Sequence, residues 1–326
     1  MASYHEPVKE FTLADGNKIP SIGLGTWQSA PGEVAAAVAH AIKSGYRHID
    51  AAWVYGNEHE VGQGIKDSGV PRDQIFVTSK CFEIHHSNPE AALKDTLTNL
   101  GLEYLDLYLM HWPLAYEPVP TSDGSLPKEV KKVDGKPVLD KIQTEDVVPC
   151  WQKMQQLVKQ GLTKSIGISN FNIRKTRHLL QHAEIKPVVN QIEVNFGNPQ
   201  PDLIQWLQRH QIVVEAYSPL GSTGAKYNDS PVFGEVASKR NVSPATVTIS
   251  WLLQRGLVVL PKSVTPSRIE SNFNFITLTK DEFEAIEKAA CSHPGSRVCD
   301  QSELASYDIF EDKHPEYNDQ AQAKLD

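Results

Sequence analysis

The chain has 326 residues, of which 40% are hydrophobic and 22% are charged, a composition that can build a buried core without a metal or a disulfide. Its formal net charge of -8 argues against nucleic acid or a membrane surface as a partner. No apolar stretch reaches the roughly 18 residues of a membrane helix, and the N-terminus does not resemble a signal peptide. We therefore expect a cytoplasmic protein.

The first expected element is a β-hairpin near the N-terminus. Asp15-Gly16 is a strong turn dipeptide that separates two short strand-like runs, 11–13 and 18–20. After it, apolar runs alternate with segments of helical periodicity. Such runs are typical of strands that are buried on both faces of a parallel sheet. The predicted strands are 47–52, 75–81, 105–112, 163–170, 187–194, 212–219, 257–264 and 273–276.

The predicted helices alternate with these strands, and the first precedes strand 47–52. They are 33–43, 58–66, 89–100, 148–159, 173–181, 201–209, 232–239, 244–254 and 280–290. Eight strand–helix units in series predict an α/β fold, either a closed (β/α)8 TIM barrel or a large doubly wound sheet. No segment resembles a linker, so we expect one domain over 1–326. The one long connection, 113–146, would leave the carboxyl end of a strand, where the active sites of barrels lie.

Ionisable side chains stand at or just beyond the ends of the first three predicted strands. Asp50 and Tyr55 accompany the first, Lys80 the second and His111 the third. In a barrel, these four side chains would meet at one rim. Taken singly, each has an ordinary explanation: a helix cap, loop packing, a solvated lysine or a structural histidine. Their common placement favours a catalytic site.

Seven stretches of the sequence carry a resemblance to a known family. They are 23–27 (GLGTW), 50–58 (DAAWVYGNE), 105–113 (LDLYLMHWP), 165–171 (SIGISNF), 191–193 (QIE), 216–221 (AYSPLG) and 261–266 (PKSVTP). In order and spacing they resemble the aldo-keto reductase family along nearly the whole chain. The resemblance implies a (β/α)8 barrel with an N-terminal β-hairpin, and an oxidoreductase that uses NADPH or NADP+ to reduce small aldehydes. Sugar aldehydes such as aldoses, glyceraldehyde or uronates are the substrates expected from it.

The resemblance also implies a catalytic tetrad of Asp50, Tyr55, Lys80 and His111. A phenol has an ordinary pKa near 10, about three units too high for easy proton transfer at neutral pH. A nearby ammonium favours the phenolate and lowers that pKa. Lys80, held by Asp50, would supply this charge to Tyr55, which then acts as the general acid in reduction. His111 would orient the carbonyl by a hydrogen bond to its oxygen.

Cofactor-binding positions follow from the same resemblance. Ser169, Asn170 and Gln191 correspond to residues that hold the nicotinamide carboxamide, and Tyr217 corresponds to the ring that stacks on it. Lys262 and Arg268 correspond to the pocket for the adenosine 2′-phosphate, so NADPH is expected rather than NADH. The full predicted set is Thr26, Trp27, Ser169, Asn170, Gln191, Tyr217, Ser218, Leu220, Ser222, Lys262, Ser263, Val264, Thr265, Arg268 and Asn272.

One departure and two absences complete this comparison. Ser271 stands where the family often has a glutamate that contacts adenine, and Glu270 comes one place earlier. The sequence has no G-x-G-x-x-G motif, which disfavours a Rossmann dehydrogenase. No metal is expected: Glu83, His85 and His86 come together in sequence, but we interpret them as a solvated loop.

The substrate pocket is expected around Trp27, Val54, Tyr55, Phe82, His111, Trp112, Cys299 and Gln301. Phe82 and Gln301 would make it roomier and more polar than in many relatives, which favours small hydroxylated aldehydes. Two alternatives remain open. One is an NADP-dependent dehydrogenase that oxidises glycerol or another polyol, and the other is a non-catalytic NADPH-binding subunit. The expected partner is a small carbonyl compound, and the protein is expected to be a monomer.

Overall fold

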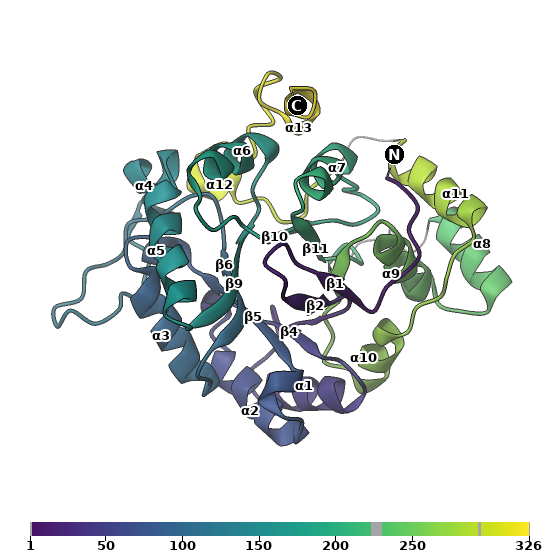
Figure 1. Cartoon of the computed structure of the whole chain (residues 1–326), viewed down its shortest axis with the longest axis horizontal. Coiled ribbons are helices and arrows are strands. Elements are labelled where there is room, and N and C mark those ends of the chain that lie inside the picture. The colour runs from purple at the N-terminus through teal and green to yellow at the C-terminus, as the bar shows by residue number, and fades with distance from the viewer. Residues whose placement is uncertain (1, 223–229, 293–294, 326) are drawn as a thin grey trace.

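Parallel strands in a ring form the centre of the computed structural model, which describes residues 2–222, 230–292 and 295–325. Within these residues, eight strands pair in chain order: β3 (Leu24–Gly25), β4 (His48–Asp50), β5 (Phe76–Cys81), β6 (Leu105–Met110), β9 (Thr163–Ser169), β10 (Val189–Glu193), β11 (Val213–Tyr217) and β12 (Val258–Leu260). Parallel bridges from Ile22 to Val259 and from Gly25 to Lys262 join the two edges. The (β/α)8 barrel is confirmed (Figure 1).

An outer ring of helices covers the strands. Its members are α1 (Val34–Lys43), α2 (Glu58–Ser68), α3 (Pro89–Leu100), α5 (Val148–Lys159), α6 (Ile173–His182), α7 (Pro201–Arg209), α8 (Pro231–Arg240), α9 (Pro244–Gln254), α10 (Pro266–Phe273) and α11 (Lys280–Ala290). Every predicted helix is present. The side chains of Asn88 and Ser243 accept hydrogen bonds from the first turns of α3 and α9, and each is followed by a proline at the first helical position. These caps explain why the helices begin where the sequence predicted.

The prediction was wrong about one barrel strand. Segment 273–276 is not a strand: Phe273 ends α10, and Phe275 and Ile276 pack against the outer core instead. The remaining barrel strand is β3, which is only two residues long and follows Gly23. A Cβ atom at Gly23 would lie 2.7 Å from the Leu260 side chain and 2.8 Å from the His48 ring. Glycine therefore allows this short strand to close the barrel.

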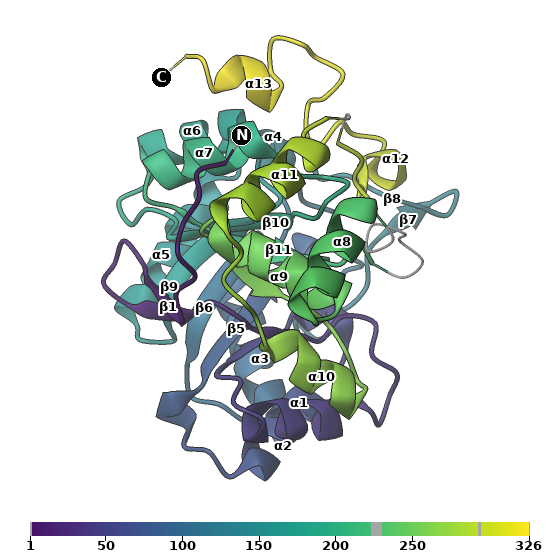
Figure 2. The ribbon, with the colours of Figure 1, turned by 90° about the vertical axis from the view of Figure 1, so that its right-hand side faces the viewer.

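The N-terminal hairpin lies across one end of the barrel. It pairs β1 (Glu10–Thr12) with β2 (Lys18–Pro20) as predicted, and Figures 1 and 2 show it over the amino ends of the parallel strands. Leu13 and Ile19 of the hairpin are buried in one apolar cluster with Leu107 and Val258 from the strands. This cluster seals the amino end of the barrel, so access to its interior is left to the carboxyl end.

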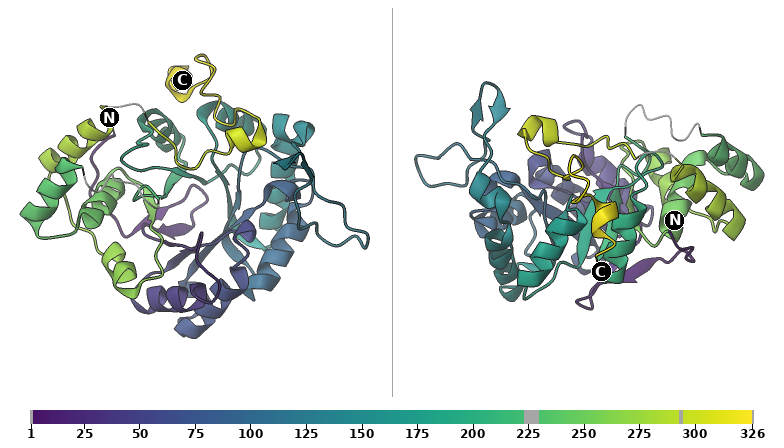
Figure 3. Two further views of the ribbon diagram at one scale, coloured as in Figure 1. Left: turned by 180° about the vertical axis from the view of Figure 1, so that it is seen from behind. Right: turned by 90° about the horizontal axis from the view of Figure 1, so that it is seen from above.

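Two segments lie at the opposite end. The connection 113–146 contains the small hairpin β7 (Lys132–Val133) and β8 (Lys136–Pro137), followed by α4 (Lys141–Glu145). The C-terminal tail contains α12 (Ser302–Ala305) and α13 (Asp319–Gln322), and Figure 3 shows it crossing the carboxyl face of the ring. The long connection thus leaves the carboxyl end of β6 as predicted. Among the described residues, no helix is long and apolar enough to cross a membrane.

Candidate active site

The four predicted catalytic side chains come together at the carboxyl end of the barrel. Asp50 is the last residue of β4, Lys80 lies in β5, and His111 directly follows β6. Tyr55 ends a short 3-10 turn, η1 (Trp53–Tyr55), which continues from β4. The Lys80 Nζ atom lies 2.8 and 2.9 Å from the two Asp50 carboxylate oxygens and donates to the Ala51 carbonyl at 2.7 Å. Three acceptors therefore hold the ammonium in place.

The ammonium faces the ring of Tyr55. Its Nζ atom lies 5.2 Å from the centroid of that ring, and the ring centroids of Tyr55 and His111 are 6.1 Å apart. Burial raises the pKa of Tyr55 to about 12, and the Lys80 charge opposes this increase. The phenol is therefore protonated at neutral pH and can serve as a proton donor.

Lys80 and His111 differ in charge. Burial alone would lower the pKa of Lys80, but Asp50 and Tyr55 outweigh it, so the pKa is raised and the side chain stays an ammonium. Burial and the nearby Lys80 hold the pKa of His111 well below its usual range. His111 is therefore neutral and fits a hydrogen-bonding role rather than that of a cation.

The predicted nicotinamide residues form one hydrogen-bonded group beside this tetrad. The Tyr217 hydroxyl donates to Asn170 Oδ1 at 2.8 Å, and Asn170 Nδ2 donates to the His111 carbonyl at 3.1 Å. Ser169 Oγ donates to the Gln191 carbonyl at 2.8 Å. Asn170 adopts a φ of 65° and Ser218 a φ of 48°, which is uncommon for residues other than glycine. Such backbone strain is often found at binding sites.

Thr26 and Trp27 lie on the other side of Tyr55. Thr26 Oγ1 donates to the Asp50 carbonyl at 2.8 Å, which connects β3 to the end of β4. The ring centroid of Trp27 is 4.8 Å from that of Tyr55, and the Trp27 side chain is 48% exposed. Trp27 is thus an open aromatic surface next to Tyr55.

The predicted phosphate residues gather at the start of α10. Lys262, Thr265 and Arg268 are exposed, and Ser263 and Val264 are partly buried. Lys262 Nζ donates to the Gln28 carbonyl at 3.1 Å. Among the described residues no carboxylate pairs with Lys262 or Arg268, so both charges are available to an anion. Further along the predicted set, Leu220 is partly buried, Ser222 is exposed and Asn272 is buried.

Glu270 points away from this group. Its carboxylate lies 2.9 Å from His40 Nε2 of α1. Ser271 Oγ donates to the Arg268 carbonyl at 3.1 Å, within its own helix. Both side chains therefore have partners within the protein.

The residues predicted to line the substrate pocket form an edge of the site that is partly apolar. Val54, Phe82 and Cys299 are partly buried, whereas Trp112 is 4% exposed and packs with Phe310 of the tail, with ring centroids 6.1 Å apart. Gln301 Oε1 accepts from the Tyr116 hydroxyl at 3.5 Å. The Trp112 ring is mainly a packing element that joins the connection 113–146 to the tail.

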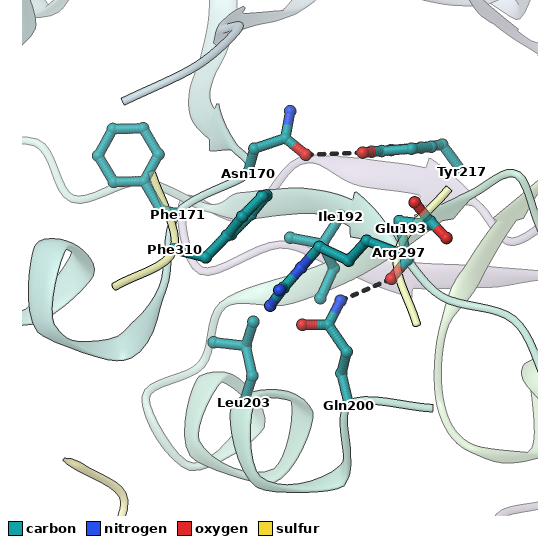
Figure 4. A pocket seen from close by; sticks show the side chains of 9 residues that line it. All are labelled: Asn170, Phe171, Ile192, Glu193, Gln200, Leu203, Tyr217, Arg297 and Phe310. Carbon is teal, nitrogen blue, oxygen red and sulfur yellow. Dashed lines mark hydrogen bonds between the residues drawn. The ribbon is translucent and has the colours of Figure 1, made fainter. Parts of the chain in front are cut away.

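A small pocket lies behind Tyr217 and Asn170, next to the tail (Figure 4). Its other lining residues are Phe171, Ile192, Glu193, Gln200, Leu203, Arg297 and Phe310. Of the predicted site residues, it includes only Asn170 and Tyr217. The Glu193 carboxylate accepts backbone hydrogen bonds from Val298 at 3.0 Å and from Cys299 at 2.7 Å. Glu193 thereby fixes the tail segment that carries Cys299.

Sequence reasoning missed two buried carboxyl groups in the barrel strands. Glu193 was noted only as part of a motif, and Glu215 was not singled out. Both are acidic residues within apolar strands, and both are at most 2% exposed. An acidic residue in a run of buried apolar residues is itself a usable signal, because a buried carboxyl needs partners.

The interpretation of 83–86 as a solvated loop was wrong. Glu83, His85 and His86 are each 1% exposed, and the first two lie in the 3-10 turn η3 (Glu83–His85). The turn is covered by apolar neighbours such as Trp112 and Tyr116, which lie in the same cluster as Ile84. Within the described residues, no group of acidic, histidine or cysteine side chains has an arrangement that suits a metal ion.

Comparisons with known proteins bear on this geometry. The model of the aldo/keto reductase family matches residues 21–290. The chain belongs to this family. It is 47% identical over 299 residues to a glycerol 2-dehydrogenase (NADP(+)) of Saccharomyces cerevisiae, covering 91% of this chain and 96% of that relative.

Two solved structures of aldo/keto reductases are also similar. The aldose reductase of Schistosoma japonicum has a TM-score of 0.84 and 36% identity, over 95% of this chain and all of that one. An aldo-keto reductase of Bombyx mori, solved in complex with NADP, has a TM-score of 0.78 and 36% identity, over 94% and 99% of the two chains. The resemblance seen in the sequence is thus confirmed at the level of family, fold and enzyme class.

Proposed function

We propose that this aldo/keto reductase uses NADPH to reduce the carbonyl of small aldehydes, sugar aldehydes among them. The observation that carries the proposal is the buried Lys80–Asp50 pair against the ring of Tyr55. A fixed ammonium beside a protonated phenol is an arrangement for donating a proton to a developing alkoxide. The similarity to an aldose reductase and to a glycerol 2-dehydrogenase supports a small polyhydroxylated substrate.

The protein side of the reaction follows from these residues. When bound, the nicotinamide supplies the hydride to the carbonyl carbon. Tyr55 donates its hydroxyl proton to the carbonyl oxygen, and Lys80 stabilises the phenolate that remains. Asp50 keeps Lys80 charged and in position. The neutral His111 imidazole donates a hydrogen bond to the carbonyl oxygen and orients it.

The residues present fit NADPH. Exposed Lys262 and Arg268, unpaired with any carboxylate among the described residues, stand beside the hydroxyls of Ser263 and Thr265 at the start of α10. A helix start with two cations and two hydroxyls suits a phosphate group. Ser169, Asn170 and Gln191 would hold the carboxamide, and the Tyr217 ring would stack on the nicotinamide. Ser218, Leu220 and Ser222 belong to the loop that would cross the pyrophosphate.

The alternatives are less well supported. A non-catalytic NADPH-binding subunit has no need of the complete Asp50–Lys80–Tyr55 arrangement, which is intact here. Oxidation of a polyol uses the same residues in reverse, with Tyr55 as the base. The similarity to an aldose reductase supports reduction.

The direct test is a steady-state assay with purified protein, NADPH and glyceraldehyde, followed by the loss of NADPH absorbance. We expect turnover with NADPH, a much higher KM for NADH, and lower kcat/KM for bulky apolar aldehydes than for short hydroxylated ones. A panel of aldoses, uronates and polyols with NADP+ ranks the substrates. No turnover of any aldehyde by a folded, NADPH-binding protein would contradict the proposal.

Four further expectations belong to the proposal. The chain acts as one domain, as a monomer, in the cytoplasm, and without a nucleic-acid partner. The single domain rests on the absence of a linker-like segment, and the lack of a nucleic-acid partner rests on the formal net charge of -8.

A further inference from the structure

A second carboxyl group lies inside the barrel close to the tetrad. Glu215 is the middle residue of β11, and none of its surface is exposed. Its strand position pairs with Gln191 of β10 in the parallel register. Glu215 Oε2 accepts a hydrogen bond from Gln191 Nε2 at 2.9 Å. The proposed reaction gives this carboxyl no role, and the apolar strand around it does not require it.

The Gln191 amide connects Glu215 to the catalytic pair. The same Nε2 atom that donates to Glu215 also donates to Asp50 Oδ1 at 2.8 Å. An amide nitrogen carries two hydrogens, so both are used by these two carboxyl groups. Only the Gln191 oxygen is then left to accept a hydrogen bond from a ligand. By accepting both amide hydrogens, the carboxyl groups of Asp50 and Glu215 leave the Gln191 oxygen as the atom that can bind a ligand in the cofactor site.

The surroundings of Glu215 make its charge costly. His48 Nε2 lies 3.5 Å from Glu215 Oε1, and His48 is neutral because burial lowers its pKa to about 4. The other charged groups facing it are Asp50 and Lys80, and the neighbouring β12 contributes only aliphatic side chains. Burial, and after it the charge of Asp50, raises the pKa of Glu215 above its ordinary value. At neutral pH the barrel interior therefore holds one ion pair and one protonated carboxyl.

We propose that Glu215 is a positioning residue with two roles, a proposal that rests on the proposed function. First, it fixes the Gln191 amide so that the Gln191 oxygen accepts a hydrogen bond from the nicotinamide carboxamide. Second, while Glu215 is protonated, Asp50 is the only negative charge that pairs with Lys80. When Glu215 ionises, a second negative charge lies near the ammonium. That charge makes the Tyr55 phenol a weaker acid, because the phenolate left behind becomes less stable. Reduction then slows as the pH rises above neutrality.

Two variants separate the two parts of this role. Glu215→Gln keeps the size and an acceptor oxygen for Gln191 but cannot ionise. Glu215→Leu removes the acceptor and leaves one buried Gln191 hydrogen without a partner. We expect NADPH Kd, measured by fluorescence titration without substrate, to stay within about twofold in Glu215→Gln and to rise about tenfold in Glu215→Leu, the size of one buried hydrogen bond. An unchanged Kd in a folded Glu215→Leu protein overturns the proposal.

The pH profile of kcat tests the charge. In the wild type we expect kcat for reduction to fall on the alkaline side of neutrality, and we expect Glu215→Gln to lose this decline. Asp319→Asn is the matched control and should keep the decline. Burial raises the pKa of Asp319 to about 7, but this carboxyl lies in the tail and accepts from the Ile173 backbone at the start of α6. An identical decline in wild type and Glu215→Gln overturns the proposal even if Glu215→Leu does not fold. A wild type that binds NADPH but reduces no aldehyde refutes the proposed function instead. In that case the NADPH titrations of the two Glu215 variants still test whether Glu215 positions Gln191.

Discussion

Tyr55 shows how a single side chain depends on its neighbours. Burial raises the pKa of the Tyr55 phenol, and the Lys80 ammonium lowers it, so the two effects oppose each other. Asp50 keeps Lys80 charged despite its complete burial. An isolated tyrosine in the same pocket would keep its proton too tightly to transfer it. We therefore expect the three residues to act as one proton-transfer unit.

Substitutions in this unit are expected to be severe but not additive. Tyr55→Phe keeps the ring and removes the transferable proton, so kcat for reduction should fall by about 10²–10⁴-fold. Lys80→Met should also be severe, because the phenol loses the ammonium that stabilises its conjugate base. The double variant should be little worse than either single one. The measurements are kcat and NADPH Kd for all three proteins. Retention of more than about a tenth of wild-type kcat by Tyr55→Phe would point to a different proton donor.

Arg268 offers a second test at the same scale. Its guanidinium is exposed and not paired with a carboxylate among the described residues, so its loss should affect only a bound anion. We expect Arg268→Ala to weaken NADPH binding by about 1.5–3 kcal/mol, the value of a hydrogen bond to a charged group, and to leave NADH binding nearly unchanged. Lys66→Ala, an exposed lysine on α2, is the control. Equal weakening for both cofactors in a fluorescence titration would exclude a 2′-phosphate contact.

The sequence pointed to the tetrad because Asp50, Tyr55 and His111 lie in stretches that resemble the family and Lys80 lies at the end of a predicted strand. It did not predict the roles of Glu193 and Glu215. Their function depends on which backbone or amide groups the fold brings against them from distant parts of the chain. Glu193, for example, binds the backbone of residues 298 and 299. Such contacts have no local pattern in the sequence.

At the scale of elements, the packing of α2 against α3 is unusually close. A Cβ atom at Gly62 would lie 2.1 Å from the backbone oxygen of Leu100, at the end of α3. A backbone atom cannot move aside as a flexible side chain can. Gly62 is thus required by the helix spacing, although glycine is a poor helix former.

The corresponding prediction is a loss of stability in Gly62→Ala. Forcing a methyl group into this contact should cost about 1–3 kcal/mol of the free energy of unfolding, which urea denaturation or a decrease in Tm will reveal. Gly234→Ala is the matched control. Gly234 also lies in a helix, α8, but a Cβ there meets nothing within 4 Å. The control should be neutral or slightly more stable because alanine has the higher helix propensity. Equal stability of both variants would refute the argument.

Helices were the best predicted elements, because their caps, proline positions and periodicity are local. The bounds of α3, α5, α7, α9 and α11 agree with the sequence prediction. Strand β3 and helix α10 were missed for physical reasons. β3 has two residues and depends on close contact with β4 and β12, and α10 begins at a proline within a segment that we interpreted as strand and loop. In the tail, α12 packs against β8 of the long connection and α13 against α6 and α7, so these short elements depend on contacts between segments distant in sequence.

Across the whole molecule, several buried carboxyl groups couple stability to pH. Burial raises the pKa of Glu83 from its ordinary 4.5 to about 8. Between these two values the unfolded chain has released this proton and the folded chain retains it. The folded state therefore binds more protons, and the free energy of unfolding falls as the pH rises from 4.5 to about 8.

Glu83→Gln is expected to reduce this dependence. One such group contributes a slope of at most about 1.4 kcal/mol per pH unit. Urea denaturation at mildly acidic and mildly alkaline pH should show a smaller loss of stability in Glu83→Gln than in the wild type. Glu103→Gln, at an exposed position, should behave like the wild type. The same slope in all three proteins would argue against a protonated Glu83.

Because the hairpin seals the amino end of the barrel, residues that stabilise the fold there are separated from residues at the carboxyl end that would contact ligands. Leu13 and Ile19 complete the core there, at the opposite end of the barrel from the tetrad. We expect substitutions at that end to alter how firmly the barrel is built, and substitutions in 113–146 and in the tail to alter which molecules it accepts. The two kinds of change are physically separate, so selection can adjust either one while leaving the other untouched.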